Sequence, residues 1–262
     1  MKIKVGDLAK IYDLSNQSLH YYENKKLISS YRDVINNYRY YDSADLSKLG
    51  TIKKYRNAKF HIDTITHVMK DVNNVDEVSN LYNEQIEILK EEIRHDYDII
   101  NVLHELNEKI SHCKENRIQI EDLDFYRVDA GETQIIFQNN RNKQFFQSWF
   151  KNILFTNSSY QLFCHDHSLQ RLHYGMACDC RYSSYIETEN DKVIRHQGKY
   201  LCGYFIDMSN STQLHTQIQT LKTYAKEHQI SLKDECFCEI IQSISGVKEP
   251  FRYSRIIIKI TC

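Results

Sequence analysis

The stretch VGDLAKIYDLSNQSLHYYENKKLI, residues 5–28, decides how the N-terminal part of the chain folds. Its first apolar residues recur on one side of a helix, at Val5, Leu8, Ala9 and Leu14. This spacing predicts a short helix that ends in a turn. Ser15 favours the N-cap position, so a second helix is predicted over residues 16–27. Two short helices joined by a tight connection are typical of a helix-turn-helix.

The following residues, 28–42, predict a small β-hairpin. The pair Asn36-Asn37 can adopt positive φ and close the turn, which makes Tyr38–Tyr41 the return strand. A hairpin beside a helix-turn-helix is a wing. Further on, Ser43 is expected to cap a helix over residues 45–60, and Asp63 to start a short helix that ends near residue 72. Residues 1–75 are therefore predicted to be a winged-helix DNA-binding domain.

A long helix is predicted over residues 76–112, because no Gly or Pro lies between Asp76 and Ser111. Its length is about 50 Å by the rise per residue. Apolar residues occupy two heptad positions, Leu89, Leu103 and Ile110 at one and Ile86, Ile93 and Ile100 at the other. Such a seam favours pairing with a second copy as an antiparallel coiled coil. Asp96 and Asn107 interrupt the seam, and the alternative is a helix that packs on its own domain.

The remaining residues, 121–262, alternate short β-rich runs with two helical patterns. Two Gly-headed strands, at Gly131 and Gly198, are each followed by a helix and two strands. The pattern predicts an α+β fold built from a duplicated βαββ unit, with an antiparallel sheet, helices on one face and a concave groove between the halves. The predicted strands cover residues 131–139, 160–167, 172–180, 183–190, 198–207, 235–243 and 251–260, and the predicted helices cover residues 141–154 and 211–229.

Composition narrows the class of protein. The chain has 262 residues, of which 41% are hydrophobic, enough for two domains with cores of their own. No apolar run is long enough to span a membrane and no signal peptide is recognisable, so a cytoplasmic protein is expected. Its eight cysteines are then expected to be free thiols. Residues 1–75 carry 13 Lys and Arg against eight Asp and Glu, which favours a polyanionic partner.

The motifs of the N-terminal third resemble the MerR family of transcription regulators, in order and over about 110 residues. They are the run YYE at residues 21–23, the run YRY at residues 38–40, and Ile52, Arg56 and Phe60 at intervals of four residues. A helix that enters the major groove needs polar side chains for base edges, and phosphates need donors on either flank. The resulting DNA-binding candidates are Asn16, Gln17, His20, Tyr21, Tyr22, Tyr38, Arg39, Lys53 and Arg56.

Several of these positions carry specific expectations. One of the two adjacent tyrosines is expected to pack in the core, and Tyr22 is favoured. Arg39, in the wing, ranks first among the phosphate contacts. His20 stands where the family usually has Arg, which replaces a permanent charge by one that depends on pH. Lys59 stands where the family usually has Gly, so a left-handed helix end there would be strained.

The C-terminal part is similar to the GyrI-like effector-binding domains of multidrug-sensing regulators, through the repeat and the run CFCEII. Strand alternation places Phe237, Glu239 and Ile241 on one face. The resemblance implies that Glu239 receives the positive charge of an effector, with Phe237 and Tyr253 as aromatic walls. The alternative is that Glu239 is exposed, or paired with Arg252 or Arg255.

The resemblance implies a homodimer that binds promoter DNA, responds to a small molecule and activates transcription by distorting the promoter, with RNA polymerase engaged indirectly. No cofactor, metal or membrane partner is expected, and no enzyme. Two alternatives stay open. The C-terminal domain resembles some hydrolases, and the Cys-x-Cys pairs Cys178/Cys180 and Cys236/Cys238 are of a type used for soft metals or oxidation sensing.

Overall fold

The computed structural model describes residues 2–131, 147, 149–165, 168–186, 193–207, 211–247 and 250–261. The chain forms two compact units, Met1–Ile93 and Arg94–Cys262. The boundary falls inside the long helix α5, Val75–Lys114. Among the described residues, no helix is both long and apolar enough to cross a membrane.

The N-terminal unit begins with the two predicted short helices, α1 (Val5–Tyr12) and α2 (Asn16–Asn24). The turn between them contains Asp13, whose φ of 49° is left-handed. The hydroxyl of Ser15 accepts a hydrogen bond from the backbone N–H of Ser18 at 2.9 Å. The predicted N-cap is therefore confirmed, and it satisfies a donor that the first turn of α2 would otherwise leave unpaired.

The wing is a three-stranded sheet in the order β1-β3-β2, made by β1 (Ile3–Lys4), β2 (Tyr31–Arg32) and β3 (Arg39–Tyr41). Asn37 has a φ of 57°, as the predicted turn requires, while Tyr38 lies before the return strand instead of inside it. The Asp33 carboxylate accepts from the backbone N–H of Ile35 at 3.0 Å, which fixes the turn locally.

Two more helices complete this unit, α3 (Ser43–Asn57) and α4 (Ile62–Lys70). Their N-caps are Asp42 and His61, so the expected starts at Ser43 and Asp63 are wrong by one or two residues. Asp42 captures the backbone N–H of Asp45 at 2.9 Å, and an ionised carboxylate is the stronger acceptor at a helix N-terminus.

Lys59, in the connection between α3 and α4, adopts a left-handed φ of 63°. This conformation costs a side-chain-bearing residue about 1–2 kcal/mol relative to glycine, which agrees with the strain expected there. Its ammonium group makes an ion pair with Glu92 at 2.7 Å. The core of the unit joins residues of all four helices and the wing, among them Leu8, Leu19, Tyr22, Tyr41, Leu49, Ile52, Phe60 and Ile65.

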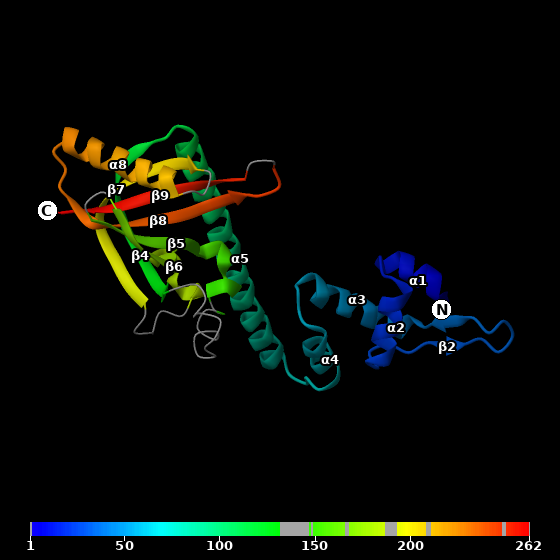
Figure 1. Ribbon diagram of the computed structural model, residues 1–262. Helices are drawn as coiled ribbons and strands as arrows, with labels where there is room; N and C mark the ends of the chain where they lie inside the picture. Colours follow the sequence, from blue (N-terminus) through cyan, green and yellow to red (C-terminus); the bar gives the residue numbers. More distant parts are fainter. Residues whose placement is uncertain are drawn as a thin grey trace. The chain divides into compact units, whose positions relative to one another are not determined.

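The C-terminal unit is a closed antiparallel barrel in the order β4-β6-β5-β8-β9-β7 (Figure 1). Its strands are β4 (Ile118–Gly131), β5 (Asn157–His165), β6 (Ser168–Asp179), β7 (Val193–Asp207), β8 (Leu232–Ile244) and β9 (Phe251–Ile260). Along the barrel the first half runs first, third, second strand (β4-β6-β5) and the second half runs second, third, first (β8-β9-β7). In each half the third strand therefore lies between the other two, and the two first strands and the two second strands pair with each other. The predicted duplication is therefore present, closed into a barrel instead of an open sheet.

Three details of the prediction differ. The first strand is β4, which ends at Gly131 instead of beginning there, and Gly198 lies five residues inside β7 with a φ of 130°. Residues 180–185 form a short 3-10 helix, η2, where part of the strand 183–190 was expected. Of the helix predicted over 141–154, residues 147 and 149–151 are helical and residues 153–155 form the 3-10 helix η1 (Ile153–Phe155). The predicted strand 132–139 and residues 187–190 lie outside the described residues.

The sheet packs against a helix on each face. Helix α8 (Ser211–Glu227) covers one face with Leu214, Ile218 and Leu221, against Cys236 and Cys238 of β8. Successive residues of a strand face opposite ways, so Phe237 and Ile241 point to the other face. There they pack with Cys113, Leu106 and Ile110 of α5. The cavity described below lies on this second face.

Candidate functional site

Helix α2 presents a polar face at the surface of the N-terminal unit. Asn16, Gln17 and His20 are exposed, and Tyr21 is 44% exposed, while Tyr22 is buried in the core. Tyr22 is thus the buried tyrosine of the pair, as expected, and the role of Tyr21 in DNA binding stays a prediction. Gln17, His20 and the two tyrosines, but not Asn16, border a surface depression beside α2 together with Arg56 and His61. Sequence reasoning did not select His61, because its role as the N-cap of α4 is visible only in the structure.

The cations predicted to contact phosphate differ in how free they are. Arg39 donates to the Glu23 carboxylate of α2 at 3.2 Å and its side chain is 31% exposed. Lys53 donates to the backbone carbonyl of Asp13 at 3.4 Å, and Arg56 to that of Phe60 at 2.8 Å. All three keep hydrogen atoms available, but each also holds elements of the wing or the helices in place. Tyr38, in the wing, is 63% exposed.

A cavity of about 380 Å³ opens in the C-terminal unit between α5, η2 and the sheet. Most of its polar lining is acidic. The ionisable residues around it are Glu105, Glu108, Lys109, His112, Glu121, Asp122, Asp124, Asp179, Arg181, Glu239 and Arg255. Seven carboxylates against three permanent cations make the cavity electronegative, and low-dielectric walls strengthen that potential.

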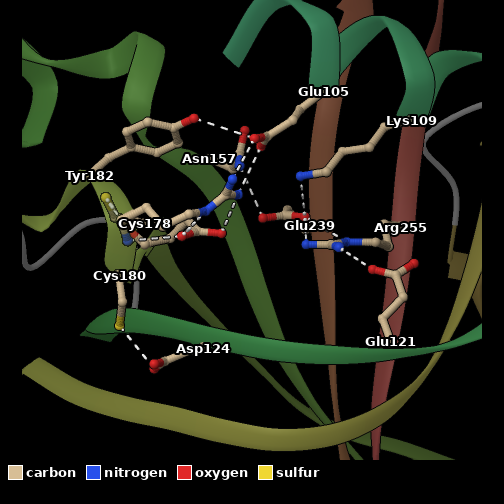
Figure 2. Close-up of polar contacts among 12 residues, drawn as sticks. Glu105, Lys109, Glu121, Asp124, Asn157, Cys178, Cys180, Tyr182, Glu239 and Arg255 are labelled. Atoms are coloured by element: carbon tan, nitrogen blue, oxygen red, sulfur yellow. Dashed lines mark hydrogen bonds and ion pairs between the residues drawn. The ribbon is translucent and has the colours of Figure 1, made fainter. Parts of the chain in front are cut away.

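Glu239 of β8 lies in the middle of the charged residues of this cavity (Figure 2). Its side chain is buried and its Oε2 accepts from Arg255, with Nε at 2.8 Å and the nearer terminal nitrogen at 2.6 Å. The Lys109 ammonium of α5 lies 3.8 Å from the same oxygen. Asn157 of β5 donates to Oε1 at 3.0 Å. The pairing with Arg255, one of the two possibilities weighed for this residue, is thus present.

Arg255 also donates to Glu121 of β4 at 3.0 Å, and Tyr204 of β7 donates to the other oxygen of Glu121. Phe237 lines the cavity beside Glu239, as expected. Tyr253 is not among the residues that line it and packs instead against Phe251, with ring centroids 5.7 Å apart. It neither holds Glu239 nor forms the predicted wall, because Tyr253 registers with Ile206 and Gln242, farther along the strands.

The aromatic residues at the cavity come from η2 and η1 instead. Tyr182 and Phe155 line it, with ring centroids 5.3 Å apart, and the Tyr182 hydroxyl contacts Glu105 of α5 at 3.3 Å. Arg181 makes two hydrogen bonds to Glu105, at 2.8 and 3.2 Å. Tyr182 and Arg181 were missed because residues 180–185 were predicted as the end of one strand, a connection and the start of the next strand, not as a 3-10 helix.

The electrostatics of Glu239 do not suit acid–base catalysis. Burial alone would raise the pKa of its carboxyl group, but Arg255 and Lys109 lower it to about 2. A general acid or base works best with a pKa near the ambient pH. The alternative of a hydrolase that uses this glutamate is therefore not supported by the site.

The thiols give no support to metal or oxidation sensing. Burial raises the pKa of Cys113 to about 11 and those of Cys178, Cys180 and Cys238 to about 12. The thiolate is the form that binds metals and reacts with oxidants, and these environments disfavour it. Cys180 donates to the Asp124 carboxylate at 3.0 Å (Figure 2). Within the described part of the chain, no three His, Cys, Asp or Glu residues are placed to hold a metal ion.

A helix-turn-helix with a wing and an exposed polar face on its second helix defines a DNA-binding domain. Comparison with known protein families matches residues 3–72 to the MerR HTH family regulatory protein. Residues 3–72 thus form a helix-turn-helix domain of the MerR type, the kind of domain that binds DNA. Among curated protein sequences, none matches it.

Solved structures give weaker likenesses. A MerR-family transcriptional regulator from Bacillus cereus is 19% identical over 45% of this chain and 88% of its own, with a TM-score of 0.40. EcmrR in a DNA complex is 15% identical over 98% of this chain and 99% of its own, with a TM-score of 0.37. A hydrolase from Listeria innocua is 5% identical over 56% of this chain and 92% of its own, also with a TM-score of 0.37. All three scores are below 0.5, and these likenesses do not decide the function.

Proposed function

We propose that this regulator is a homodimer that binds promoter DNA through residues 1–75 and responds to a cationic small molecule bound in the cavity of its C-terminal unit. The observation that carries the proposal is the electronegative cavity with the buried Glu239 at its centre. Activation through distortion of the promoter, with RNA polymerase engaged indirectly, is part of the same proposal.

Dimerisation is assigned to the apolar stripe of α5. The exposed fractions of its predicted seam residues are 47% for Ile86, 55% for Ile93, 48% for Ile100 and 53% for Leu103. Side chains at this spacing share one side of a helix, and a soluble protein rarely leaves such a stripe in water. Leu89 is half-buried, and Ile110 packs against the core of its own unit. We therefore restrict the proposed seam to Ile86–Leu103.

Replacement of Arg39 by alanine is expected to weaken binding to operator and random duplex alike. A phosphate contact carries no sequence information, so the salt dependence of the affinity should flatten by about one unit of slope. Asn16→Ala should instead reduce the preference for operator over random duplex. Fluorescence anisotropy at several salt concentrations measures both quantities. Lys233→Ala, an exposed cation of β8, is the control for charge loss; an Arg39→Ala protein with the slope of this control would refute a wing contact.

Glu239→Gln is expected to weaken the binding of a monovalent organic cation in the cavity by about tenfold to a hundredfold. The substitution keeps the shape of the side chain but leaves Arg255 and Lys109 with one carboxylate fewer. Calorimetric titration with benzyltrimethylammonium, and with its neutral carbon isostere neopentylbenzene, measures the change. Asp122→Asn removes an exposed carboxylate from the cavity lining and should have a smaller effect. Equal losses for cation and isostere would show that Glu239 shapes the cavity without reading charge.

A further inference from the structure

Four charged side chains form one buried group at the cavity: Glu239, Arg255, Glu121 and Lys109 (Figure 2). They come from β8, β9, β4 and α5, so only the folded C-terminal unit brings them together. Two carboxylates face two cations, and the group is neutral. An additional cation beside Glu239 would give this group a surplus positive charge, which is costly where the charged side chains are buried.

The two cations are held very differently. Arg255 makes three hydrogen bonds, two to Glu239 at 2.6 and 2.8 Å and one to Glu121 at 3.0 Å, and its side chain is 8% exposed. Lys109 approaches Glu239 only to 3.8 Å and is 19% exposed. Within the described residues this is its one ion pair. A charge at that distance contributes less than a hydrogen-bonded one, so Lys109 is the easier of the two to displace.

The ammonium group of Lys109 has a second carboxylate, that of Glu105, within reach on the same helix. Glu105 precedes Lys109 by four residues on α5, a spacing that brings two side chains together on one side of a helix. Figure 2 shows the two on the same helix, above Glu239. The lysine stem is flexible and can carry the ammonium towards water or towards Glu105. Removal of Lys109 from the group leaves a net charge of minus one, which a single monovalent cation restores to zero.

We propose that Lys109 determines the charge specificity of the cavity: its ammonium group occupies the place of the effector's cation beside Glu239, and a monovalent organic cation binds by exchange with it. This inference rests on the proposed function of the cavity and names the residue that opposes the ligand. The same exchange moves a side chain of α5, the helix that begins at Val75 in the N-terminal unit.

The protonation energetics of the lysine agree with a loosely held cation. Burial, followed by the positive charge of Arg255, lowers the pKa of Lys109, and the carboxylates oppose this only in part. The ammonium form is therefore disfavoured where it lies. Its release into water regains hydration, which offsets part of the free energy that displacement requires.

The test is Lys109→Met, which keeps the length and apolar stem of the side chain but removes the charge. Benzyltrimethylammonium, titrated calorimetrically into the full chain, is expected to bind about tenfold or more tightly to this variant than to wild type. Neopentylbenzene should bind both proteins equally. Lys233→Met removes a cation from the surface of the same unit and is expected to leave both affinities unchanged.

The outcomes separate this inference from the proposed function. Weaker binding to Glu239→Gln together with unchanged or weaker binding to Lys109→Met would keep the cationic site and overturn the role of Lys109. Unchanged binding to both variants would overturn the cationic effector as well. Benzoate that binds wild type but not Lys109→Met would show that the ammonium receives anions, which also overturns the exchange.

A measurement on the wild-type side chain covers the case in which Lys109→Met does not fold. Reductive methylation with ¹³C formaldehyde labels the lysines, and the spectrum of Lys109→Arg identifies the Lys109 signal. Saturation with benzyltrimethylammonium should move the pKa of Lys109 up, towards that of an exposed lysine, because the ammonium leaves its buried place. A signal whose titration is unaffected by the saturating cation would overturn the proposal.

Discussion

Lysine at both Ile93 and Ile100 is expected to dissociate the homodimer and to abolish operator binding, while each unit stays folded. Both residues are about half exposed in the single chain, so the substitutions cost little within it. In the dimer they would place charges in an apolar seam, and an unpaired buried charge costs several kcal/mol. Four such charges per dimer correspond to a loss of more than about a thousandfold in affinity between the chains.

Sedimentation velocity measures the dissociation, and gel shift measures the loss of operator binding. Ile88 offers a matched control, because it is 53% exposed on the same helix but two residues from Ile86, a spacing that places it on a different side. Ile88→Lys should leave the dimer intact. A protein with both Ile93→Lys and Ile100→Lys that still sediments as a dimer would rule out this stripe as the interface.

Local signals in the sequence were enough to predict the secondary structure of the N-terminal unit. Ser15 as an N-cap, Asn37 with positive φ and the uninterrupted helix after Val75 each depend on residues close in the chain. The cap of α3 was misplaced by one residue because Asp42 and Ser43 are both good caps, and only the structure shows which one captures a backbone N–H.

Strand β4 shows where such signals fail. Its residues 118–131 read as polar, with Glu121 and Arg127 among them, so the run lacks the apolar alternation of a buried strand. Both side chains are nevertheless inside the unit. Glu121 pairs with Arg255 and Arg127 contacts Ser159 at 3.4 Å, so their partners lie far away in the sequence. A charge compensated over that distance cannot be distinguished from an exposed one by local pattern.

The same limit applies to the cavity. Strand alternation correctly placed Phe237 and Glu239 on one face, and Arg255 was one of the expected partners. Lys109 and Glu121 were not predicted, because nothing in the sequence of the long helix or of β4 marks a residue that contacts β8 or β9. Tyr253 was wrongly predicted to lie beside Glu239. In the structure Glu239 pairs with Arg255 and Tyr253 pairs with Gln242, and the register shift between Ile240 and Gln242 cannot be read from the sequence.

Arg255→Met is expected to destabilise the C-terminal unit by about 3–5 kcal/mol, the usual cost of removing one partner from a buried ion pair. The substitution removes the ion pairs of Arg255 with Glu239 and Glu121, and within the described residues leaves Glu239 with Lys109 as its one ion-pair partner. Scanning calorimetry of the full chain should show a lower transition temperature for this unit. Arg195→Met removes the ion pair between Arg195 and Asp124. The Arg195 side chain is 52% exposed, so this substitution should lower the stability much less than Arg255→Met.

The pH dependence of stability distinguishes the loss of charge compensation in Arg255→Met from a general disruption of packing. In wild type the pKa of Glu239 is about 2, below its unfolded value, so its stabilising effect is complete at neutral pH and is lost only as the pH falls from about 4.5 towards 2. Without Arg255, burial is expected to raise that pKa above the unfolded value. The variant should therefore gain stability when the pH is lowered from 7 to 5, whereas this group contributes no change to wild type over that range. Addition of Glu239→Gln to Arg255→Met should recover most of the lost stability and remove the gain on acidification. If Arg255→Met alone were as stable as wild type at pH 7, Arg255 would not compensate these carboxylates.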